Sequence, residues 1–329
     1  MTKNVQNATS DKIVSHPLQS CEWGEFRKKW GNEVIYTKYG LITLHKIPFT
    51  GMFTGRAWKV ATFIKGPRPT KAMLSELKTE GIKHNVIFIK IESNFVPENE
   101  ITKNELTKLL RDSGCVPGKT LFTPTTFWID LTPPEEDIFK KFSSKTRYNI
   151  RLAQRNRVVV EENNSEKAFE KYLELTRETV ERQGFYAHTE KYHRLMWKYL
   201  RPAEIAHLLT AKYKNEIITT WIVFTYKDFL YYPYGASSNK YKNIMANNLI
   251  MWEAIRFGKK MGLKTFDLWG REPGKGFTRF KEGYNPKVVE LLGTWDLVIN
   301  KPVYTIYRLA EQIRWPILRL KSKLAKPTF

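Results

Sequence analysis

Basic side chains recur at helical spacing in residues 135–157, where they form a stripe of Lys140, Arg147, Arg151 and Arg155. Apolar residues at the same spacing occupy another side of the segment, so residues 135–157 are predicted to form one long helix. Like charges four residues apart on a helix repel each other, and no acids are interleaved with these arginines. Phosphate groups would compensate the repulsion, because arginine binds them through charge-assisted hydrogen bonds. The stripe is therefore a candidate phosphate-binding surface, and a solvated helix face is the alternative.

Other patterns that carry chemistry are mostly absent from the sequence. The six histidines show no HExxH or other metal-ligand spacing, so we expect no metal site. There is no GxGxxG, Walker or GxSxG motif either. The two cysteines, Cys21 and Cys115, provide neither a disulfide framework nor a zinc pattern, which fits a reducing compartment.

The composition predicts polyanionic partners. The chain has 55 Lys+Arg against 33 Asp+Glu, and its formal net charge of +22 favours nucleic acid, an anionic membrane surface or a phosphorylated substrate. The charge alone does not choose among these three. No apolar run is long enough to span a bilayer, and the first 15 residues lack an apolar core. We therefore expect a cytoplasmic protein.

A strand, a helix and a second strand are predicted in residues 229–269. Pro233 interrupts an aromatic strand, and because proline cannot donate to a ladder it marks either a sheet edge or a β-bulge. Residues 245–261 repeat apolar side chains with a helical period, and Gly262 follows at the usual helix stop. Residues 264–269 are predicted to be a buried strand. This order predicts a right-handed crossover, and such crossovers usually carry a binding site at the strand ends.

The 329 residues suit two domains, and 42% hydrophobic residues are ample for two cores. The strand predicted at 127–131 runs into Pro133 and Pro134, and a double proline stops a strand, so we place the domain boundary there. The first half is predicted to contain helices at 19–31, 71–81 and 102–112 and strands at 33–45, 57–66 and 84–92. The second half is predicted to add a strand at 158–161, helices at 166–183 and 191–200, and three strands within 205–234.

The last segment, residues 302–329, is predicted to be a helix interrupted by Pro316. The part before the proline has an apolar face suited to packing on the first domain. The part beyond it is basic and amphipathic, which suits the cytoplasmic leaflet of a membrane, where each lysine or arginine contributes about 1 kcal/mol. We therefore expect peripheral contact with an anionic membrane.

Three runs together carry a resemblance to a known family. They are GASSNKYKNIMANNLIMWEAIRFGKKMGLKTFDLWG from Gly235, SSKTRYNIRLAQR from Ser143, and the pair Phe280 and Lys281 ahead of VVELLGTWDL. In this order and spacing the chain resembles the Fem family (FemABX) of non-ribosomal peptidyltransferases over residues 19–304. The resemblance implies an aminoacyltransferase that builds the interpeptide bridge of peptidoglycan from aminoacyl-tRNA.

The same resemblance implies the fold class, which is α/β (α+β) with two GNAT-like acyltransferase domains in tandem. In the family the chain returns after the second domain to complete the first, which assigns residues 1–132 and 293–329 to the first domain and residues 133–292 to the second. A CoA-dependent GNAT enzyme needs a glycine-containing loop that holds pyrophosphate at a helix start, and residues 242–247 contain no glycine. That absence argues against CoA and agrees with a charged tRNA as donor, without a cofactor.

Carried over residue by residue, the resemblance places Phe280 and Lys281 in the active site. Aminolysis of an aminoacyl ester passes through a tetrahedral oxyanion, and a fixed ammonium near that oxygen lowers the barrier. Glu92 corresponds to a family aspartate near the acceptor amine. We expect either this carboxylate or the leaving ribose oxygen to take the proton.

The resemblance also implies an acceptor site for a muramyl pentapeptide. Arg27 matches a family lysine that contacts the nucleotide diphosphate, and Trp30 follows at the matching spacing. His188 occupies a position where the best-studied branch has an arginine. The tyrosines that match substrate-contacting tyrosines of the family are Tyr192, Tyr232 and Tyr234. Packing is the alternative for the tyrosines and the tryptophan, because aromatic residues are more often part of a core than of a ligand site.

We therefore predict a monomeric aminoacyltransferase that moves an amino acid from aminoacyl-tRNA to the stem-peptide amine of UDP-MurNAc-pentapeptide or lipid II. Its candidate tRNA-binding residues are Arg147, Arg151 and Arg155. A small-molecule N-acyltransferase that uses acyl-CoA is the first alternative. A non-catalytic RNA-binding protein is the second, and it would bind with a steep salt dependence and form no product.

Overall fold

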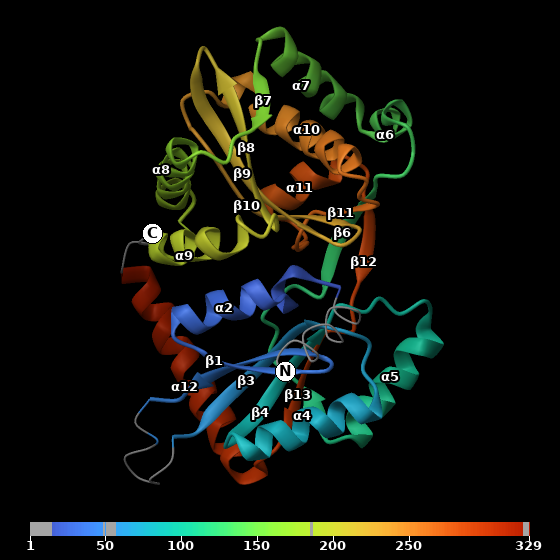
Figure 1. Cartoon of the computed structure of the whole chain (residues 1–329), viewed down its shortest axis with the longest axis vertical. Helices are drawn as coiled ribbons and strands as arrows, with labels where there is room; N and C mark the ends of the chain where they lie inside the picture. The colour runs from blue at the N-terminus through green and yellow to red at the C-terminus, as the bar shows by residue number, and fades with distance from the viewer. Residues whose placement is uncertain (1–14, 49, 51–56, 185–186, 325–328) are drawn as a thin grey trace. The chain divides into compact units, whose positions relative to one another are not determined.

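The computed structural model describes residues 15–48, 50, 57–184, 187–324 and 329, and the side chains of residues 313–324 are outside that description. The chain divides into two compact units. Unit 1 comprises residues 1–124 and 290–324, and unit 2 comprises residues 125–289 and 325–329. Figure 1 shows the helices and strands of each unit.

Unit 1 is built on a six-stranded mixed sheet. In spatial order its strands are β1 (Glu33–Thr37), β2 (Gly40–Lys46), β3 (Lys59–Gly66), β4 (Val86–Ser93), β13 (Thr294–Val298) and β5 (Cys115–Pro117). β3 and β4 are parallel, and the other neighbours are antiparallel. Because β13 lies between β4 and β5, a late segment of the chain completes a sheet that the early segments begin.

Helices of unit 1 pack against this sheet. They are α2 (Cys21–Trp30), α4 (Lys71–Lys83), α5 (Glu100–Asp112) and α12 (Lys301–Leu324), with a short 3-10 helix η1 (Pro17–Gln19) before them. α2 begins after Ser20, whose hydroxyl accepts a hydrogen bond from the Trp23 N–H, and ends at Gly31, which has a φ of 106° that favours glycine. α4 and α5 bury apolar side chains in one core with β4. α12 packs on β4 through Tyr304, whose ring centroid lies 5.1 Å from that of Phe88.

Unit 2 is built on a seven-stranded sheet. In spatial order its strands are β12 (Lys287–Glu290), β6 (Thr125–Asp130), β11 (Thr265–Asp267), β10 (Phe229–Ser237), β9 (Glu216–Tyr226), β8 (Ala206–Tyr213) and β7 (Val159–Glu162). β10 runs parallel to β11, and this pairing covers only Phe229 to Tyr231. Beyond Tyr231, β10 continues beside β9 without β11. The sheet therefore opens along one side of β10.

Helices cover both faces of the second sheet (Figure 1). They are α6 (Glu135–Lys141), α7 (Ser144–Arg155), α8 (Glu166–Gln183), α9 (Glu190–Leu200), α10 (Ala246–Lys260) and α11 (Gly276–Glu282), with the 3-10 helix η2 (Lys242–Ile244) before α10. α7 and α10 share one face of the sheet and contribute to its main core. α8 lies on the opposite face.

The strand, helix and second strand predicted in residues 229–269 are confirmed as β10, α10 and β11, with the two strands parallel and adjacent. Both interpretations of Pro233 hold locally. The register of β10 with β9 shifts between Tyr231 and Tyr234, which is a bulge, and the pairing of β10 with β11 ends at Tyr231, so Pro233 lies where one side of β10 has no neighbouring strand. A proline is accepted at this position because a bulge leaves one residue outside the ladder and the open side needs no donor.

Residues 135–157 do not form the single long helix that their periodicity predicts. Two helices, α6 and α7, are separated where Phe142 is extended and Ser143 accepts a hydrogen bond from the Thr146 N–H as the N-cap of α7. The Phe142 side chain is fully buried, and its ring centroid lies 5.0 Å from that of Tyr284. Burial of this ring and the serine cap therefore turn the chain.

The boundary between the units lies between Pro124 and Thr125, earlier than the boundary predicted after residue 132. β6 belongs to unit 2 because it pairs with β11 and so continues the second sheet. The return to unit 1 begins at Glu290 rather than at residue 293. α12 continues as a helix through Pro316, where an interruption is predicted, and the basic side chains expected at a membrane lie outside the described residues.

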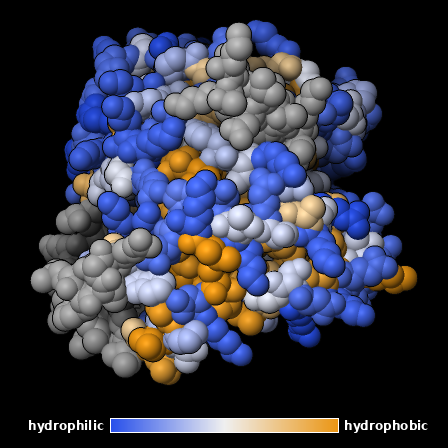
Figure 2. Space-filling view, turned by 60° about the horizontal axis from the view of Figure 1, so that its bottom comes forward, coloured by the Kyte–Doolittle hydropathy of each residue, from blue (hydrophilic) through white to orange (hydrophobic). Residues whose placement is uncertain are grey.

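Apolar side chains remain exposed on unit 1. On α12, Ile306 is 66% exposed and Leu309 is 56% exposed, and on α4 Ile82 is 63% exposed. Figure 2 shows a face on which apolar residues lie among hydrophilic ones. The described part of α12 thus presents apolar side chains to solvent as well as to the sheet.

Candidate active site

Lys281 lies on α11 with its side chain buried in unit 2. Its ammonium donates hydrogen bonds to the carbonyl oxygens of Trp269, at 2.5 Å, and Gly270, at 3.0 Å. The ring of Phe277 lies beside it, with Nζ 5.0 Å from the ring centroid. An ammonium has three N–H donors, and among the described residues only these two carbonyls accept from it. The third donor therefore has no hydrogen-bond acceptor among the described residues.

Burial changes the acidity of this lysine. Removal from water lowers the pKa of Lys281 to about 8, because an apolar environment disfavours the charged form. The carboxylates of Asp267 and Glu272 oppose this effect and raise the pKa. At neutral pH the side chain is mainly an ammonium, and small changes in its surroundings alter its charge.

Unit 2 has a cavity of about 800 Å³ where β10 continues without β11. A cavity of this volume is large enough to hold a small-molecule group. Its walls combine aromatic and polar side chains from β10, α8, α10 and the segment that leads into α11. The residues that line it are Thr179, Gln183, Tyr232, Gly235, Ala236, Ser237, Asn247, Glu272, Lys275, Gly276, Phe277 and Phe280. Phe280 thus lies on the cavity wall, whereas Lys281, the next residue of α11, is not a lining residue in the described part of unit 2.

The bulge at Pro233 divides the tyrosines of β10 between the two faces of the sheet. Tyr232 stacks on Trp221, with ring centroids 3.7 Å apart, and lines the cavity. Burial raises the pKa of Tyr232 well above its usual value, so its hydroxyl stays protonated. Tyr234 pairs with Ile222 in the register and lies close to Phe224, which belongs to the other face. The predicted substrate tyrosines therefore do not form one group.

Tyr234 instead belongs to an aromatic cluster with residues of the α9 region. His188 stacks on Tyr192, with centroids 3.9 Å apart, and His193 lies edge-on to Tyr234 at 4.9 Å. His193 is buried, and its Nδ1 lies 3.0 Å from the hydroxyl of Tyr172. Burial lowers the pKa of His193 to about 3, with a smaller effect of His188, so this ring is neutral at physiological pH. The structure thus brings together three of the predicted acceptor residues, His188, Tyr192 and Tyr234.

Glu92 lies in unit 1, at the end of β4, and its carboxylate is buried. Oε1 accepts hydrogen bonds from the Leu121 N–H at 2.8 Å and from the Thr294 hydroxyl at 2.6 Å. Oε2 accepts from the Phe122 N–H at 3.2 Å. The carboxylate therefore joins β4, β13 and the loop after β5, and most of its acceptor capacity is in use.

Arg27 and Trp30 both lie on α2 in unit 1. The Arg27 guanidinium is 5.9 Å from the ring centroid of Phe26. Its positive charge adds to burial in lowering the pKa of His45 to about 4. Trp30 is 36% exposed, which is unusual for a tryptophan that only packs. Both side chains are therefore accessible at least in part from the surface of unit 1.

The three candidate tRNA-binding arginines have different surroundings. Arg147 is half-buried and donates to the carbonyl oxygens of Lys140, at 3.0 Å, and Phe142, so it caps the end of α6. Arg151 and Arg155 are exposed and lie over the rings of Phe139 and Tyr148, respectively. The stripe therefore contains one structural arginine and two that are open to solvent.

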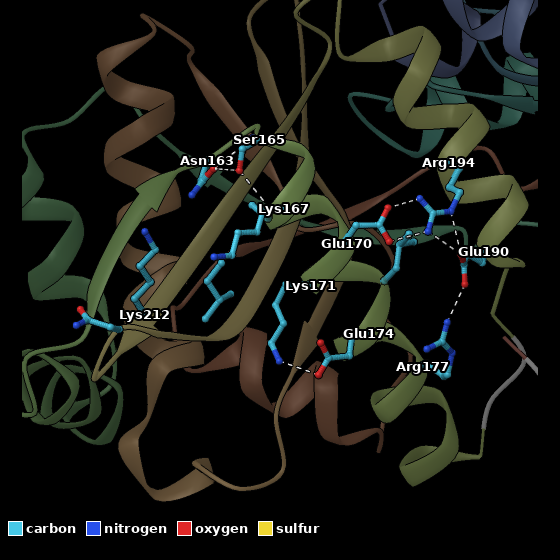
Figure 3. Close-up of a pocket in the computed structure, with 14 residues that line it drawn as sticks. Asn163, Ser165, Lys167, Glu170, Lys171, Glu174, Arg177, Glu190, Arg194 and Lys212 are labelled. Carbon is cyan, nitrogen blue, oxygen red and sulfur yellow. Dashed lines mark hydrogen bonds and ion pairs between the residues drawn. The ribbon is translucent and has the colours of Figure 1, made fainter.

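A second cavity, of about 720 Å³, lies between α8, α9 and the hairpin of β8 and β9 (Figure 3). Several of its charged side chains pair with one another. Arg194 binds Glu170 and Glu190, and Arg177 binds Glu190 at 2.8 Å. None of the predicted site residues lines it. We therefore take the cavity beside Phe280 as the candidate active site.

Two groups near the candidate site carry no recognisable signal in the sequence. Asp267 is a single acid at the end of β11, and His193 has no partner at metal-ligand spacing. Their importance depends on tertiary neighbours, which only the structure supplies. Among the described residues, no three His, Cys, Asp or Glu side chains gather so that they could hold a metal ion.

Comparison with known proteins identifies the family. The model of the FemAB family matches residues 118–212 and 201–312, which together exceed half of the chain. The chain belongs to the FemAB family. This membership confirms the predicted enzyme class, an aminoacyltransferase.

Curated relatives in the FemAB family cover nearly the whole chain. The lipid II:glycine glycyltransferase of Staphylococcus haemolyticus is 23% identical in an alignment that covers 98% of this chain and 98% of the relative. The lipid II:glycine glycyltransferase of Staphylococcus epidermidis is 22% identical with the same coverage. That of Staphylococcus aureus is 29% identical over 103 residues, which is 29% of this chain and 24% of the relative.

A solved structure of FemX superimposes with a TM-score of 0.79 at 16% identity, covering 93% of this chain and 98% of FemX. L-PGS of Bacillus licheniformis gives a TM-score of 0.53 at 16% identity, covering 92% of this chain and 95% of that chain. Likeness at this level of identity shows the fold alone. The predicted α/β fold class is confirmed, because the chain forms two units that each contain a mixed sheet, and it shares the fold of FemX. Within the described residues, no helix is both long and apolar enough to cross a membrane.

Proposed function

We propose that this FemAB-family protein transfers an amino acid from an aminoacyl-tRNA to the stem-peptide amine of lipid II and so builds the interpeptide bridge of peptidoglycan. The observation that carries this proposal is the Lys281 ammonium, which two carbonyls hold and which follows Phe280, a residue on the wall of the cavity of about 800 Å³. Lipid II as acceptor is supported by relatives named lipid II:glycine glycyltransferases that align over 98% of the chain.

The cavity beside Phe280 takes the aminoacyl end of the donor. Its volume of about 800 Å³ suits a group of that size. Tyr232 and Phe280 offer aromatic surfaces, and Asn247 and Glu272 offer polar groups that would orient an amino acid and a ribose. Donor specificity then depends on this wall, because the amino acid must fit between the aromatic and polar groups.

The transfer is an aminolysis. The neutral amine of the acceptor attacks the ester carbonyl, a carbon–nitrogen bond forms, and a tetrahedral oxyanion develops. The Lys281 ammonium stabilises this oxyanion through its positive charge, and the two carbonyls that hold it keep that charge in place. The carbon–oxygen bond to the ribose then breaks, and the proton lost by the amine ends on the leaving ribose oxygen. Phe280 excludes water from the ester, which limits hydrolysis.

Glu92 acts in this proposal by shaping unit 1 rather than by taking a proton. Its carboxylate accepts hydrogen bonds from two backbone N–H groups and one hydroxyl, so most of its acceptor capacity is used within unit 1. Holding the loop at Leu121 and Phe122 beside β4 is the role that these contacts support.

Each unit, taken by itself, carries candidate residues for the acceptor. In unit 2 the cluster of His188, Tyr192 and Tyr234 provides stacking and hydrogen-bonding surface, and its packing on buried His193 makes it rigid. In unit 1, Arg27 contacts the acceptor diphosphate and Trp30 a neighbouring apolar part. Arginine suits a diphosphate because its fork of donors pairs with two phosphate oxygens.

In this proposal tRNA and the membrane contact exposed side chains outside the cavity. Arg151 and Arg155 contact the phosphates of tRNA, since both are exposed and carry no acidic partner among the described residues. Peripheral membrane contact brings the enzyme to a lipid-linked acceptor, and the exposed Ile306 and Leu309 on α12 support it. The net charge of +22 favours both partners.

One reaction tests the function. The purified protein is incubated with a mixture of aminoacyl-tRNAs and, in parallel, with lipid II or UDP-MurNAc-pentapeptide, and the acceptor mass is read. We expect a gain of one amino-acid residue on lipid II that requires charged tRNA. No mass gain with any charged tRNA would reject the proposal. Acylation from acyl-CoA with stabilisation by CoA in thermal unfolding would identify an N-acyltransferase instead, and salt-dependent tRNA binding without product would identify an RNA-binding protein.

A further inference from the structure

Asp267 is a buried carboxylate at the end of β11, directly before the turn that contacts Lys281. Oδ1 accepts hydrogen bonds from the Thr126 hydroxyl at 2.5 Å and from the Trp269 N–H at 2.8 Å. Oδ2 accepts from the indole N–H of Trp128 at 3.0 Å. β6 therefore holds both oxygens, and the turn holds Oδ1.

The turn that follows has an uncommon backbone. Trp269 has a φ of 58°, in the left-handed region that disfavours a large side chain, and Gly270 has a φ of 50°. A tryptophan remains in this conformation only when its surroundings fix it. The hydrogen bond from its N–H to Asp267 is one such restraint, and edge-on ring contacts with Phe224 and Tyr231 are others.

The same two residues supply the carbonyls that receive the Lys281 ammonium. Rotation of the turn out of the left-handed region would redirect these carbonyl oxygens, because a carbonyl direction follows the backbone dihedrals. The chain of contacts thus runs from Thr126 and Trp128 through Asp267 to the turn, and from the turn to Lys281.

We propose that Asp267 is a positioning residue, whose carboxylate holds the turn at Trp269 and Gly270 and thereby fixes the place and the charge of the Lys281 ammonium. This inference rests on the proposed function, since it assigns Lys281 the stabilisation of the oxyanion. Asp267 itself is not assigned a contact with the substrate, because Thr126, Trp128 and Trp269 already donate to its two oxygens.

Electrostatics gives the same residue a second effect. The charged groups that act on Lys281 are Asp267, at the end of β11, and Glu272, in the loop before α11, and both raise the pKa that burial lowers to about 8. Loss of the negative charge at Asp267 would therefore lower the pKa of Lys281 further. At a fixed pH near 8, less of the lysine would then be an ammonium.

The test compares Asp267→Asn, which removes the charge and keeps the size, with Asp267→Glu, which keeps the charge and moves the carboxylate. Asp228→Asn is the matched control, since Asp228 is exposed and pairs with Lys264 away from the turn. Two quantities are measured: the pKa of Lys281, from the pH dependence of its acetylation in competitive labelling read by peptide mass spectrometry, and kcat against pH with charged tRNA and lipid II. The first needs no catalytic activity, so it separates this inference from the proposed function.

For Asp267→Asn we expect the pKa of Lys281 to be lower by half a unit or more and kcat to be reduced by about tenfold or more. The decline of kcat with rising pH should begin at a lower pH than in the wild type. The KM values should change less than twofold. For Asp267→Glu we expect the same loss of kcat with the pKa of Lys281 nearly unchanged. Asp228→Asn should match the wild type in both measurements.

A folded Asp267→Asn protein with a wild-type Lys281 pKa and wild-type kcat would overturn the inference. If that variant does not fold, Asp267→Glu decides, because wild-type kcat in this variant would show that the position of the carboxylate is irrelevant. A wild type without transferase activity would reject the proposed function alone, and the shift in Lys281 labelling would still test the link to Asp267.

Discussion

Tyr232 and Tyr234 lie on opposite faces of the second sheet although only Pro233 separates them. The register of β10 with β9 passes from the pair of Tyr231 and Phe224 to the pair of Tyr234 and Ile222, so two residues of β10 face one residue of β9. In a regular strand, residues two apart point to the same face. The bulge thus places Tyr232 on the donor cavity and Tyr234 in the cluster assigned to the acceptor.

The two tyrosines should therefore affect different substrates. Tyr232→Phe removes a hydroxyl from the cavity wall, and we expect it to raise the KM for aminoacyl-tRNA about three- to tenfold with the KM for lipid II unchanged. Tyr234→Phe should raise the KM for lipid II and leave that for tRNA unchanged, because a lost hydrogen bond costs about 0.5–1.5 kcal/mol. Steady-state kinetics with each substrate varied in turn measures both.

Gly235→Ala provides a check on the first of these assignments. A Cβ at this position would lie 2.0 Å from the Tyr232 hydroxyl oxygen, so the tyrosine must move. The variant should raise the KM for tRNA at least as much as Tyr232→Phe. Equal effects of all three variants on both substrates would contradict the division of the site.

Lys281→Met should reduce kcat by about 10²–10³-fold with little change in either KM, because it keeps the length of the side chain and removes the charge that stabilises the oxyanion. Lys281→Arg should restore only part of the activity, since a planar guanidinium cannot use the same two carbonyls in the same way. Lys214→Met and Lys287→Met are the controls, because both lysines are exposed and neither lines the cavity. If all three Met variants have similar kcat values, Lys281 has no special role.

The low pKa of Lys281 predicts a dependence of catalysis and stability on pH. The Lys281 ammonium loses its proton as pH rises through about 8, so kcat should decrease above that pH. Between about pH 8 and 10.5 the unfolded chain keeps a proton that the folded chain has released, so the free energy of unfolding should rise with pH. Relative to Lys281→Met, the rise is at most on the order of 3 kcal/mol, and urea unfolding at a series of pH values measures it. A difference between the two proteins that falls over this range would contradict the assigned direction.

Glu92→Gln separates two roles for this residue. If the carboxylate holds the loop, the free energy of unfolding should fall by about 1–3 kcal/mol, because the amide of glutamine would face a backbone N–H donor. In that case kcat at saturating substrates should change less than tenfold. Thermal unfolding and kinetics measure the two effects, and exposed Glu98→Gln is the control. A loss of kcat beyond a hundredfold in a protein of wild-type stability would instead identify Glu92 as the general base.

The arginines of the stripe should also have two different roles, one in tRNA binding and one in stability. Arg151→Gln with Arg155→Gln should weaken tRNA binding and reduce the slope of log K against log salt by roughly 1 to 2, since each phosphate contact contributes about 0.7–0.9. Arg147→Gln should instead lower the free energy of unfolding, by about 1.5–3 kcal/mol, because it removes charged hydrogen bonds to two carbonyls at the end of α6. Lys198→Gln with Lys260→Gln, exposed on other helices of unit 2, should leave the slope unchanged. An unchanged slope in the Arg151 and Arg155 variant would mean that these residues only face solvent.

Patterns of local periodicity predict much of this fold. The crossover of β10, α10 and β11 follows from a strand, a helical period and Gly262, and each of these signals is local in sequence. The single helix predicted over residues 135–157 fails because its break depends on Phe142, which a partner distant in sequence, Tyr284, helps to bury. The spacing of apolar residues within 135–157 cannot reveal a partner that is distant in sequence.

The candidate site is predictable from the sequence only where its residues form a local motif. Phe280 and Lys281 form a motif with neighbours in sequence, and the structure places Phe280 on the cavity wall and Lys281 next to it on α11. The bulge gives a signal, Pro233, but the proline alone leaves open which tyrosine faces which side. Asp267 gives none, because its role depends on Thr126 and Trp128 from another strand.

The position of β13 between β4 and β5 has a consequence for the order of folding during synthesis on the ribosome. All of residues 125–289, which form unit 2, are synthesised before Thr294, the first residue of β13. Unit 2 can thus complete its sheet while β4 of unit 1 still has one edge unpaired. An unpaired edge of a buried, apolar strand favours pairing with other chains. Nascent chains that stop before residue 294 should therefore contain a folded unit 2 and an incomplete, aggregation-prone unit 1. Addition of β13 to the first sheet is then the last event needed for the native state.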